Sequence, residues 1–209
     1  MRVALVTDTY PPEIGGAALS ASRFVEALTE RGHQVQVVRP RQPEEPPHAP
    51  VPGVELVLVR GVRAPFLPGF QLGLPAGKKL TRLWSRRRPD LVHVVNEFLL
   101  GRSALRAARA LRLPLTTSFH TNFHSYGVHY GLGLLEPAAT GYLRRFHARG
   151  ARTLVPTEQT RARLAALGFT HLALILFARQ PAVKGMRWTG RRWKMSPRGP
   201  GCPARWSRW

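Results

Sequence analysis

The sequence is poor in cysteine and in long apolar runs. Its 209 residues include one cysteine, Cys202, which excludes a disulfide framework and a cysteine-based metal site. The longest apolar run, residues 172–178, falls far short of the roughly 20 residues that cross a bilayer. The first eight residues lack the pattern of a secretory signal. We therefore expect a cytoplasmic protein.

Acidic residues are also scarce. The chain has 32 Lys and Arg against 11 Asp and Glu, and no acid follows Glu158. Residues 1–169 hold 23 of the basic residues and all 11 acids, so the imbalance is most extreme in residues 170–209. A basic surface suggests nucleic acid or an anionic membrane as a partner. The uneven distribution weakens that inference for the body of the chain.

Residues 170–209 have a composition of their own. They hold four of the five tryptophans, mixed with Arg, Gly and Pro and without any period. One interpretation is a basic, aromatic arm that stacks on single-stranded nucleic acid. The other is a lost reading frame, because an out-of-frame GC-rich gene yields this composition. The lack of any acid favours the second, and we expect a disordered or frameshifted tail after one domain at residues 1–169.

Apolar, β-branched runs alternate with segments of helical period over residues 1–169. Such alternation predicts an α/β fold, a Rossmann-like parallel sheet with helices on both faces. Gly32 is expected to end the first helix, and Thr157 to cap the last. The predicted strands are 3–7, 35–39, 54–60, 91–95, 115–119 and 153–155, and the apolar helix stripes lie within 21–28, 104–111 and 139–146.

A glycine pair, Gly15 and Gly16, lies between the first strand and the helix that follows it. Backbone N–H groups at a helix start are unpaired, and glycine has no Cβ to keep an anion away. The segment matches neither the dinucleotide-binding GxGxxG pattern nor a P-loop. On the two glycines alone, a tight strand-to-helix turn and a phosphate site are equally good readings.

Polar residues cluster where the fourth and fifth predicted strands end. Glu97 follows the fourth strand, and residues 118–126, with His120 and His124, follow the fifth. Ligands of open parallel sheets bind beyond the carboxyl ends of the strands. His120 is as compatible with a structural role as with a functional one. His120 and His124 lack the glutamate of HExxH, so no metal site is expected.

Several segments, taken together and in order, resemble family 4 of the glycosyltransferases. These are residues 3–16, Asn96-Glu97-Phe98 with Gly101, residues 118–123, and residues 129–131. The resemblance covers residues 1 to about 169. Within the family it is strongest to lipid-directed, GDP-mannose-type mannosyltransferases and related glycolipid synthases.

The resemblance implies a GT-B enzyme, in which two Rossmann-like domains face a cleft and residues 1–169 form the N-terminal, acceptor-side domain. It implies hexose transfer, with retention, from GDP-mannose or a UDP-sugar to a lipid or glycolipid acceptor, without a metal or other cofactor. The Gly15 and Gly16 amides would meet the donor diphosphate, and His120 would lie against the transferred sugar as the catalytic residue. Tyr10, Glu97 and Asn122 are candidates for the cleft edge and the acceptor.

The sequence departs from the family after the first domain. Members continue into a second domain whose paired acids bind the donor, and no acid follows Glu158 here. We therefore expect a truncated enzyme that is inactive by itself. The alternative is a non-catalytic basic protein whose tail binds nucleic acid or anionic surfaces. A basic stretch, residues 78–88 with Leu80, Leu83 and Trp84, fits either peripheral contact with the inner membrane surface or a solvated helix face.

Overall fold

The computed structural model describes residues 1–11, 13, 15–43, 51–64, 70–120, 136–175, 186–188 and 193–195. The chain divides into two compact units, Met1–Ile175 and Leu176–Trp209. In the second unit, β10 (Met186–Trp188) pairs antiparallel with β11 (Trp193–Met195). The first unit contains every candidate site residue.

The first unit is built on one seven-stranded sheet in the order β3-β2-β1-β6-β7-β8-β9, with all neighbours parallel. Its strands are β1 (Arg2–Val6), β2 (Gln34–Pro40), β3 (Val54–Val59), β6 (Leu91–Val94), β7 (Leu115–Ser118), β8 (Arg152–Val155) and β9 (Leu172–Leu174). The six strands predicted from sequence are thus confirmed. β9 was not predicted, and it lies beyond the expected boundary at residue 169.

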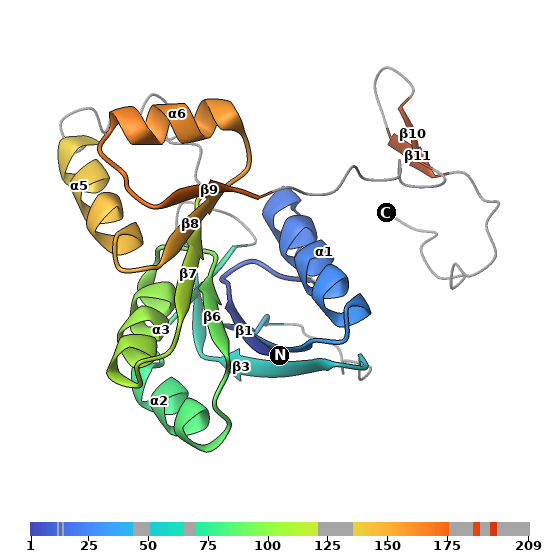
Figure 1. The fold of residues 1–209 in the computed structure, drawn as a ribbon. Helices are drawn as coiled ribbons and strands as arrows, with labels where there is room; N and C mark the ends of the chain where they lie inside the picture. Colours follow the sequence, from blue (N-terminus) through green and yellow to red (C-terminus); the bar gives the residue numbers. More distant parts are fainter. Residues whose placement is uncertain are drawn as a thin grey trace. The chain divides into compact units, whose positions relative to one another are not determined.

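Helices cover both faces of this sheet, as the alternating pattern predicts (Figure 1). α1 packs on one face, against Leu5, Val35 and Val37. α2, α3 and α5 pack on the other face. The helices are α1 (Gly16–Glu30), α2 (Gly77–Arg86), α3 (Leu99–Ala110), α5 (Glu136–His147) and α6 (Glu158–Ala166).

Both predicted helix ends are confirmed. Gly32 follows α1 with φ of 75°, a left-handed conformation that glycine adopts without steric cost. The Thr157 hydroxyl accepts a hydrogen bond from the Thr160 N–H at 3.1 Å and so caps α6. These two ends are set by local chemistry.

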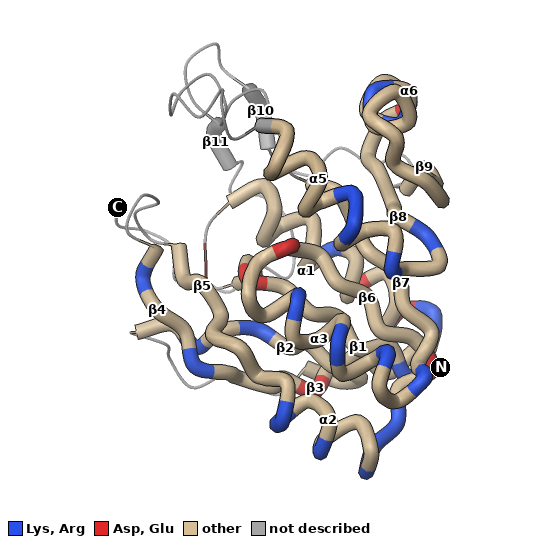
Figure 2. Tube along the Cα trace, turned by 90° about the vertical axis from the view of Figure 1, so that its left-hand side faces the viewer, with Lys and Arg blue, Asp and Glu red and all other residues tan. Residues whose placement is uncertain are grey.

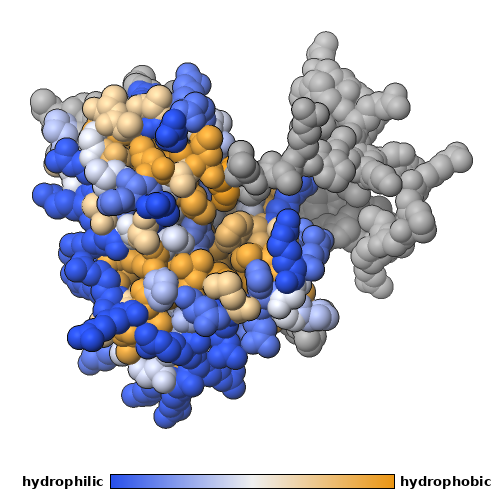
Figure 3. Space-filling view, viewed as in Figure 1, coloured by the Kyte–Doolittle hydropathy of each residue, from blue (hydrophilic) through white to orange (hydrophobic). Residues whose placement is uncertain are grey.

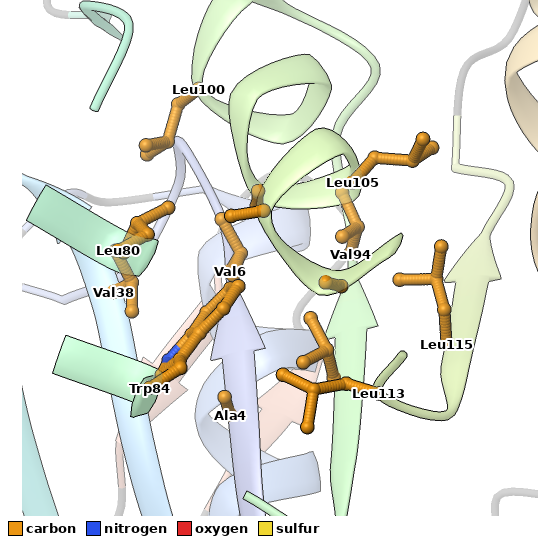
Figure 4. Packing of buried hydrophobic residues seen from close by; sticks show 14 of the residues in the cluster. Ala4, Val6, Val38, Leu80, Trp84, Val94, Leu100, Leu105, Leu113 and Leu115 are labelled. Atoms are coloured by element: carbon orange, nitrogen blue, oxygen red, sulfur yellow. The ribbon is translucent and has the colours of Figure 1, made fainter. Parts of the chain in front are cut away.

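The apolar side of the basic stretch belongs to the core. Leu80 and Trp84 on α2 are fully buried, and Leu83 packs against the same cluster. Figure 4 shows Trp84 directed from α2 toward Val6 of β1. The Trp84 indole N–H donates to Gln36 Oε1 at 2.9 Å. Leu80 and Trp84 are therefore not available to a membrane, and the exposed side of α2 is mainly basic.

A short hairpin that the sequence did not predict lies near the start of α3. β4 (Gly61–Arg63) pairs antiparallel with β5 (Gln71–Gly73). A Cβ on Gly73 would lie 2.8 Å from Leu100 Cβ, so only glycine lets β5 approach α3 this closely. The hairpin brings Gly73 to the end of β1.

Apolar side chains also reach the surface. Leu167 and Leu174, after α6 and in β9, are 46% and 37% exposed. Figure 3 shows apolar side chains at the surface of the body among polar ones. None of the helices in the described ranges combines the length and the hydropathy that crossing a bilayer requires.

Candidate functional site

The candidate residues follow three neighbouring strands. β1, β6 and β7 are adjacent and parallel, so their carboxyl ends share one edge of the sheet. Tyr10, Gly15 and Gly16 follow β1, Glu97 follows β6 and His120 follows β7. Ligands of parallel sheets bind at this edge. Asn122 lies outside the described residues.

Asn96 joins the segments that follow β1 and β6. Its side-chain oxygen accepts hydrogen bonds from the Thr7 hydroxyl at 3.0 Å and from the Asp8 N–H at 2.8 Å. The Thr7 hydroxyl is buried and also lies 2.8 Å from the Thr9 carbonyl oxygen. We call the segment from Asp8 to Gly16, which joins β1 to α1, the glycine turn. Its start is therefore tied to the segment that carries Glu97.

The glycine turn is open. Gly15 precedes the first residue of α1, and neither a side-chain cap nor an acid in the first turn occupies the helix start. The φ of Gly15 is 177°, extended backbone that any residue adopts. A Cβ on Gly15 or Gly16 would meet no atom of the described residues within 4 Å. Packing within this part of the chain therefore does not require glycine. Both glycines are exposed and lie at the start of α1, the positive end of its dipole.

Gly101 is a contrasting case. A Cβ there would lie 1.9 Å from the Asn96 carbonyl oxygen and 2.9 Å from Val94 Cγ1. Glycine at 101 is thus required by packing, because the first turn of α3 lies against the segment after β6. The motif that contains Asn96 and Gly101 is explained by structure, whereas the motif that contains Gly15 and Gly16 is not.

His120 is partly buried and lies two residues after the end of β7. Burial lowers the pKa of its imidazole, and the negative charge of Glu97 acts in the opposite direction. On the neighbouring strand, His93 lies 2.8 Å from Thr116 Oγ1 and 2.6 Å from Ser118 Oγ. Burial, with a smaller contribution from His120, lowers the pKa of His93 to about 3. His93 is therefore a neutral, structural residue.

Glu97 is buried rather than exposed at the edge. Only 6% of the residue is exposed, and Oε1 lies 3.2 Å from Nε2 of the buried His147. The Tyr142 hydroxyl donates to the Glu97 carbonyl oxygen at 2.6 Å. Sequence reasoning treated the stripe at 139–146 as core and did not single out His147. Its partner lies 50 residues away, and no local pattern points to that contact.

Asp8 was also missed. It is 1% exposed, and its Oδ1 accepts a hydrogen bond from the Gly73 N–H at 2.7 Å. Its Oδ2 has no hydrogen-bond partner among the described residues. Burial raises the pKa of Asp8 to about 7, the Gly73 hydrogen bond lowers it, and the charges of Glu97 and Glu13 raise it further. A buried carboxyl with such a pKa is a frequent feature of functional sites.

A second shifted carboxyl lies within the turn itself. Burial raises the pKa of Glu13 to about 7, against the opposing charge of Arg39. Arg39 is buried near the end of β2, where one of its N–H groups donates to the Pro40 carbonyl oxygen. Tyr10 is partly buried beside Leu5 and Val35 of the α1 face. The residues before the glycine pair are thus seated on the sheet, while the pair itself is open.

Among the described residues, neither a metal-ligand cluster nor a surface depression adds to the candidate site. Among the residues that the structure describes, no three His, Cys, Asp or Glu side chains are grouped as metal ligands would be. A depression of about 320 Å³ lies near the amino ends of β1 and β2, with Arg2, Glu55 and Arg87 in its lining. Glu55 there pairs with Arg87 at 3.1 Å. This depression is on the opposite edge of the sheet and takes no part in the candidate site.

Comparison with known proteins decides the family. The sequence profile described as Glycosyltransferase Family 4 matches residues 14–175. The chain belongs to glycosyltransferase family 4. It is 33% identical over 168 residues to the GDP-mannose-dependent alpha-mannosyltransferase of Mycolicibacterium smegmatis, with 79% of this chain and 44% of that protein covered. The alpha-monoglucosyldiacylglycerol synthase of Acholeplasma laidlawii is 28% identical over 167 residues, which cover 76% of this chain and 41% of the synthase.

Solved structures confirm the fold of this family 4 chain. The sucrose-phosphate synthase of Thermosynechococcus elongatus superposes with a TM-score of 0.60 at 14% identity, over 83% of this chain and 47% of the synthase. The expected Rossmann-like parallel sheet with helices on both faces is thereby confirmed. The chain spans less than half the length of the two curated relatives described above. The alternative of a non-catalytic basic binding protein finds no support in these similarities.

Proposed function

We propose that this family 4 chain supplies the acceptor-side half of a retaining glycosyltransferase that moves a hexose from a nucleotide sugar to a lipid or glycolipid acceptor. Family membership and the names of the relatives support this proposal. Among donors we favour GDP-mannose, because the M. smegmatis relative is described as GDP-mannose-dependent. The name of the A. laidlawii relative indicates a diacylglycerol glycolipid as its product.

The open glycine turn is the observation that carries the proposal. A Cβ on Gly15 or Gly16 would meet no atom of the described residues within 4 Å, so packing there does not explain why glycine stands at the start of α1. The N–H groups of a helix start bind phosphate well. We propose that this space receives the diphosphate of the donor.

The chemistry of transfer suits this arrangement. The bond between the sugar and the diphosphate breaks while the oxygen of the acceptor hydroxyl bonds to the sugar and gives up its proton, which the leaving diphosphate takes. Negative charge develops on this diphosphate as its bond to the sugar breaks. Fixed N–H dipoles at Gly15 and Gly16 stabilise that charge where it appears. We assign His120 as a hydrogen-bond donor to the transferred sugar and not as a nucleophile. Tyr10 and Asn122 remain candidates for contact with the acceptor.

The other half of the donor site is proposed to lie in a second domain outside residues 1–209. The resemblance places paired acids there, and no acid follows Glu158 in this sequence. Residues 1–169, extended by β9 to Leu174, would then form the acceptor-side domain. The unit Leu176–Trp209 has no assigned part in transfer.

Binding of a nucleotide sugar to the 209-residue chain tests the proposal. We expect GDP-mannose to shift the amide NMR signals of Gly15 and Gly16, with weak affinity. Gly16→Val should reduce that affinity at least about tenfold, a loss near 1.4 kcal/mol, because its side chain fills the space for phosphate. Gly77→Val is the matched control, since Gly77 is likewise the first residue of a helix and its Cβ would have 3.9 Å of clearance.

Failure of GDP-mannose and of UDP-glucose to shift these signals would overturn the proposal. Equal loss of binding in both valine variants would also count against the glycine turn as the site. Nucleic-acid binding is the rival function, and it predicts steeply salt-dependent retention of the chain on DNA or RNA. Retention of that kind without any response to nucleotide sugars would favour the rival.

We also propose that the chain makes peripheral contact with an anionic membrane. Lys78, Lys79, Arg82 and Arg86 lie on the exposed side of α2, and Figure 2 shows Lys and Arg recurring along this helix. With the apolar side of α2 in the core, contact would be electrostatic only. Co-sedimentation with phosphatidylglycerol vesicles at low salt, lost at high salt and absent with phosphatidylcholine, is the expected result. Binding to both vesicle types alike would contradict it.

A further inference from the structure

The β4–β5 hairpin has two faces of different character. Its register pairs Gly61 with Gly73 and Val62 with Leu72. Because neighbouring residues of a strand point to opposite sides of a sheet, the two glycines share one face of the hairpin. The valine and the leucine share the other face.

The glycine face is turned toward the body of the unit. A Cβ on Gly61 would lie 2.8 Å from Pro40 Cβ, and a Cβ on Gly73 would lie 2.8 Å from Leu100 Cβ. Gln71, which belongs to the same face, is buried. The body therefore covers this face of the hairpin, and the opposite face is directed away from the body.

Apolar side chains gather on the outward face and continue onto the start of α3. The Ala64 N–H donates to the Phe70 carbonyl oxygen at 2.9 Å, so the pairing of the hairpin extends to these residues. Phe70 thus lies on the same face as Val62 and Leu72. The rings of Phe70 and Phe98 meet edge-on, with centroids 5.9 Å apart. We call this set the hairpin patch; its members are Val62, Phe70, Leu72, Phe98 and Leu99.

The hairpin patch lies at the surface. Val62, Phe98 and Leu99 are 45%, 42% and 50% exposed, and Phe70 and Leu72 are partly buried. None of these described residues belongs to the buried apolar clusters of the unit. An exposed apolar patch with a polar rim marks a site of contact with another molecule or with a membrane.

Basic side chains accompany the patch. Arg60 and Arg63 lie on either side of Val62 in the sequence, at and beside β4. Arg102 lies one turn of α3 after Phe98, and its N–H donates to the Phe98 carbonyl oxygen. All three arginines are exposed. Figure 2 shows basic residues on β4 and recurring along α2, which begins four residues after β5.

Acids are scarce in this part of the sequence. Between Glu55 and Glu136 the sequence holds only Asp90 and Glu97. Glu97 is buried, and Asp90 directly precedes the amino end of β6. The hairpin is bonded to Asp8 at the carboxyl end of the neighbouring β1, so Asp90 lies at the opposite edge of the sheet. The exposed charge beside the patch is therefore positive.

An anionic bilayer matches this combination, because it offers negative headgroups at its surface and hydrocarbon beneath them. A second copy of the chain matches it less well. Two copies joined through the same patch would bring their positive charges together, and like charges in proximity oppose association.

We propose that the hairpin patch inserts into the hydrocarbon boundary of an anionic bilayer, while the surrounding basic side chains contact the headgroups. The inference rests on the proposed membrane contact of α2, whose exposed side contributes charge, and adds an apolar part to it. A single myristoyl chain gives only marginal membrane binding, so a patch of this size needs the charge attraction as well. High salt therefore still releases the chain.

The position of the patch gives insertion a use. The Gly73 N–H donates to Asp8 Oδ1, which ties the hairpin to the residues that follow β1. Those residues lead into the glycine turn. An inserted hairpin therefore brings the carboxyl edge of the sheet to the surface of the bilayer, where a lipid acceptor lies.

A phosphatidylglycerol monolayer tests the inference on the 209-residue chain. Inserted side chains raise the surface pressure at constant area, whereas charges that stay among the headgroups raise it little. We expect the wild-type chain to raise the pressure and Val62→Ser combined with Leu99→Ser to lose most of that rise. Leu167→Ser is the matched control, because Leu167 is 46% exposed after α6 and lies outside the patch. That variant should keep the rise.

Co-sedimentation with phosphatidylglycerol vesicles at low salt gives the size of the effect. The double variant should bind at least about tenfold more weakly than the wild type, because two partly exposed aliphatic side chains no longer enter hydrocarbon. If the double variant fails to give a native amide spectrum, Leu99→Ser alone decides by the same two measurements, since it changes only the first residue of α3.

Two results of these measurements overturn the inference. A wild-type chain that co-sediments with the vesicles without raising the monolayer pressure would leave the charge contact of α2 standing and refute insertion. Equal pressure rises from the wild type and the folded serine variant would also refute it.

Self-association is the other outcome to examine. A wild-type chain that dimerises without lipid, beside a monomeric serine variant, would show that the patch joins two copies and would overturn the inference. These measurements use no nucleotide sugar, so their failure is distinct from failure of GDP-mannose to bind at the glycine turn.

Discussion

The Gly73 N–H donates a hydrogen bond to Asp8 Oδ1 at 2.7 Å, which ties the β4–β5 hairpin to the end of β1. The carboxyl that accepts this bond is almost fully buried and lies near Glu97 and Glu13. A Cβ on Gly73 would lie 3.0 Å from that same oxygen, so glycine is needed for the approach. The contact joins elements 65 residues apart.

The first prediction is that Asp8→Asn stabilises the chain at pH 8. The pKa of Asp8 rises from 3.8 to about 7 on folding, chiefly through burial. The folded state therefore holds a proton that the unfolded state has lost between these pH values, and stability falls as pH rises from about 4 to 7. Above pH 7 the folded chain bears the full free-energy cost of a buried, ionised Asp8 carboxylate. Asparagine keeps the acceptor for Gly73 and avoids this cost.

Urea denaturation at pH 5 and pH 8 measures the effect. The free energy of unfolding of Asp8→Asn should exceed that of the wild type, by more at pH 8 than at pH 5. Asp90→Asn is the control, because Asp90 is exposed and accepts from the Arg2 N–H at 2.7 Å. An Asp8→Asn chain that loses stability at pH 8 would mean that the ionised carboxylate is required.

A second prediction concerns Gly101→Ala. The new Cβ would lie 1.9 Å from the Asn96 carbonyl oxygen, which is backbone and cannot move aside cheaply. We expect a loss of at least about 3 kcal/mol in the free energy of unfolding, the upper end of overpacking costs. Gly141→Ala in α5 is the matched control, because its nearest contact is 3.9 Å away. Alanine there should stabilise α5 by about 0.5–1 kcal/mol.

A third prediction is that the 209 residues alone do not transfer sugar. Half of the groups that would stabilise the leaving diphosphate are proposed to lie in a second domain, and loss of even one such donor costs about 10²- to 10³-fold in rate. Release of GDP from GDP-mannose, or of UDP from UDP-glucose, in the presence of a diacylglycerol acceptor provides the assay. Turnover near 1 per second, an ordinary enzymatic rate, would refute the prediction.

A fourth prediction concerns the two units of the chain. Arg and Lys are frequent after Phe169, and Leu176–Trp209 forms a unit separate from Met1–Ile175. Limited trypsin digestion should trim the C-terminal unit and leave a stable fragment that ends near residue 175, identified by mass spectrometry. Protection of the C-terminal unit equal to that of the body would show that it packs as a folded part and would count against a lost reading frame.

Local sequence determined much of the framework. Six of the seven strands of the sheet, the end of α1 at Gly32 and the cap of α6 at Thr157 follow from period, glycine conformation and hydroxyl capping. Each of these depends on residues within one element or its immediate flanks. The same is true of the glycine pair, which the sequence places between the first strand and the first helix and which lies at the start of α1.

Tertiary structure alone decided how the remaining features are used. An apolar stripe such as that of α2 indicates burial but not the covering partner, and packing placed Leu80 and Trp84 in the core. The environment of Glu97 depends on His147, 50 residues away, and that of Asp8 on Gly73, 65 residues away. Burial shifts a pKa only after the chain has excluded water from the group. A carboxyl's role at this edge is therefore a property of the folded chain, because distant segments supply its surroundings.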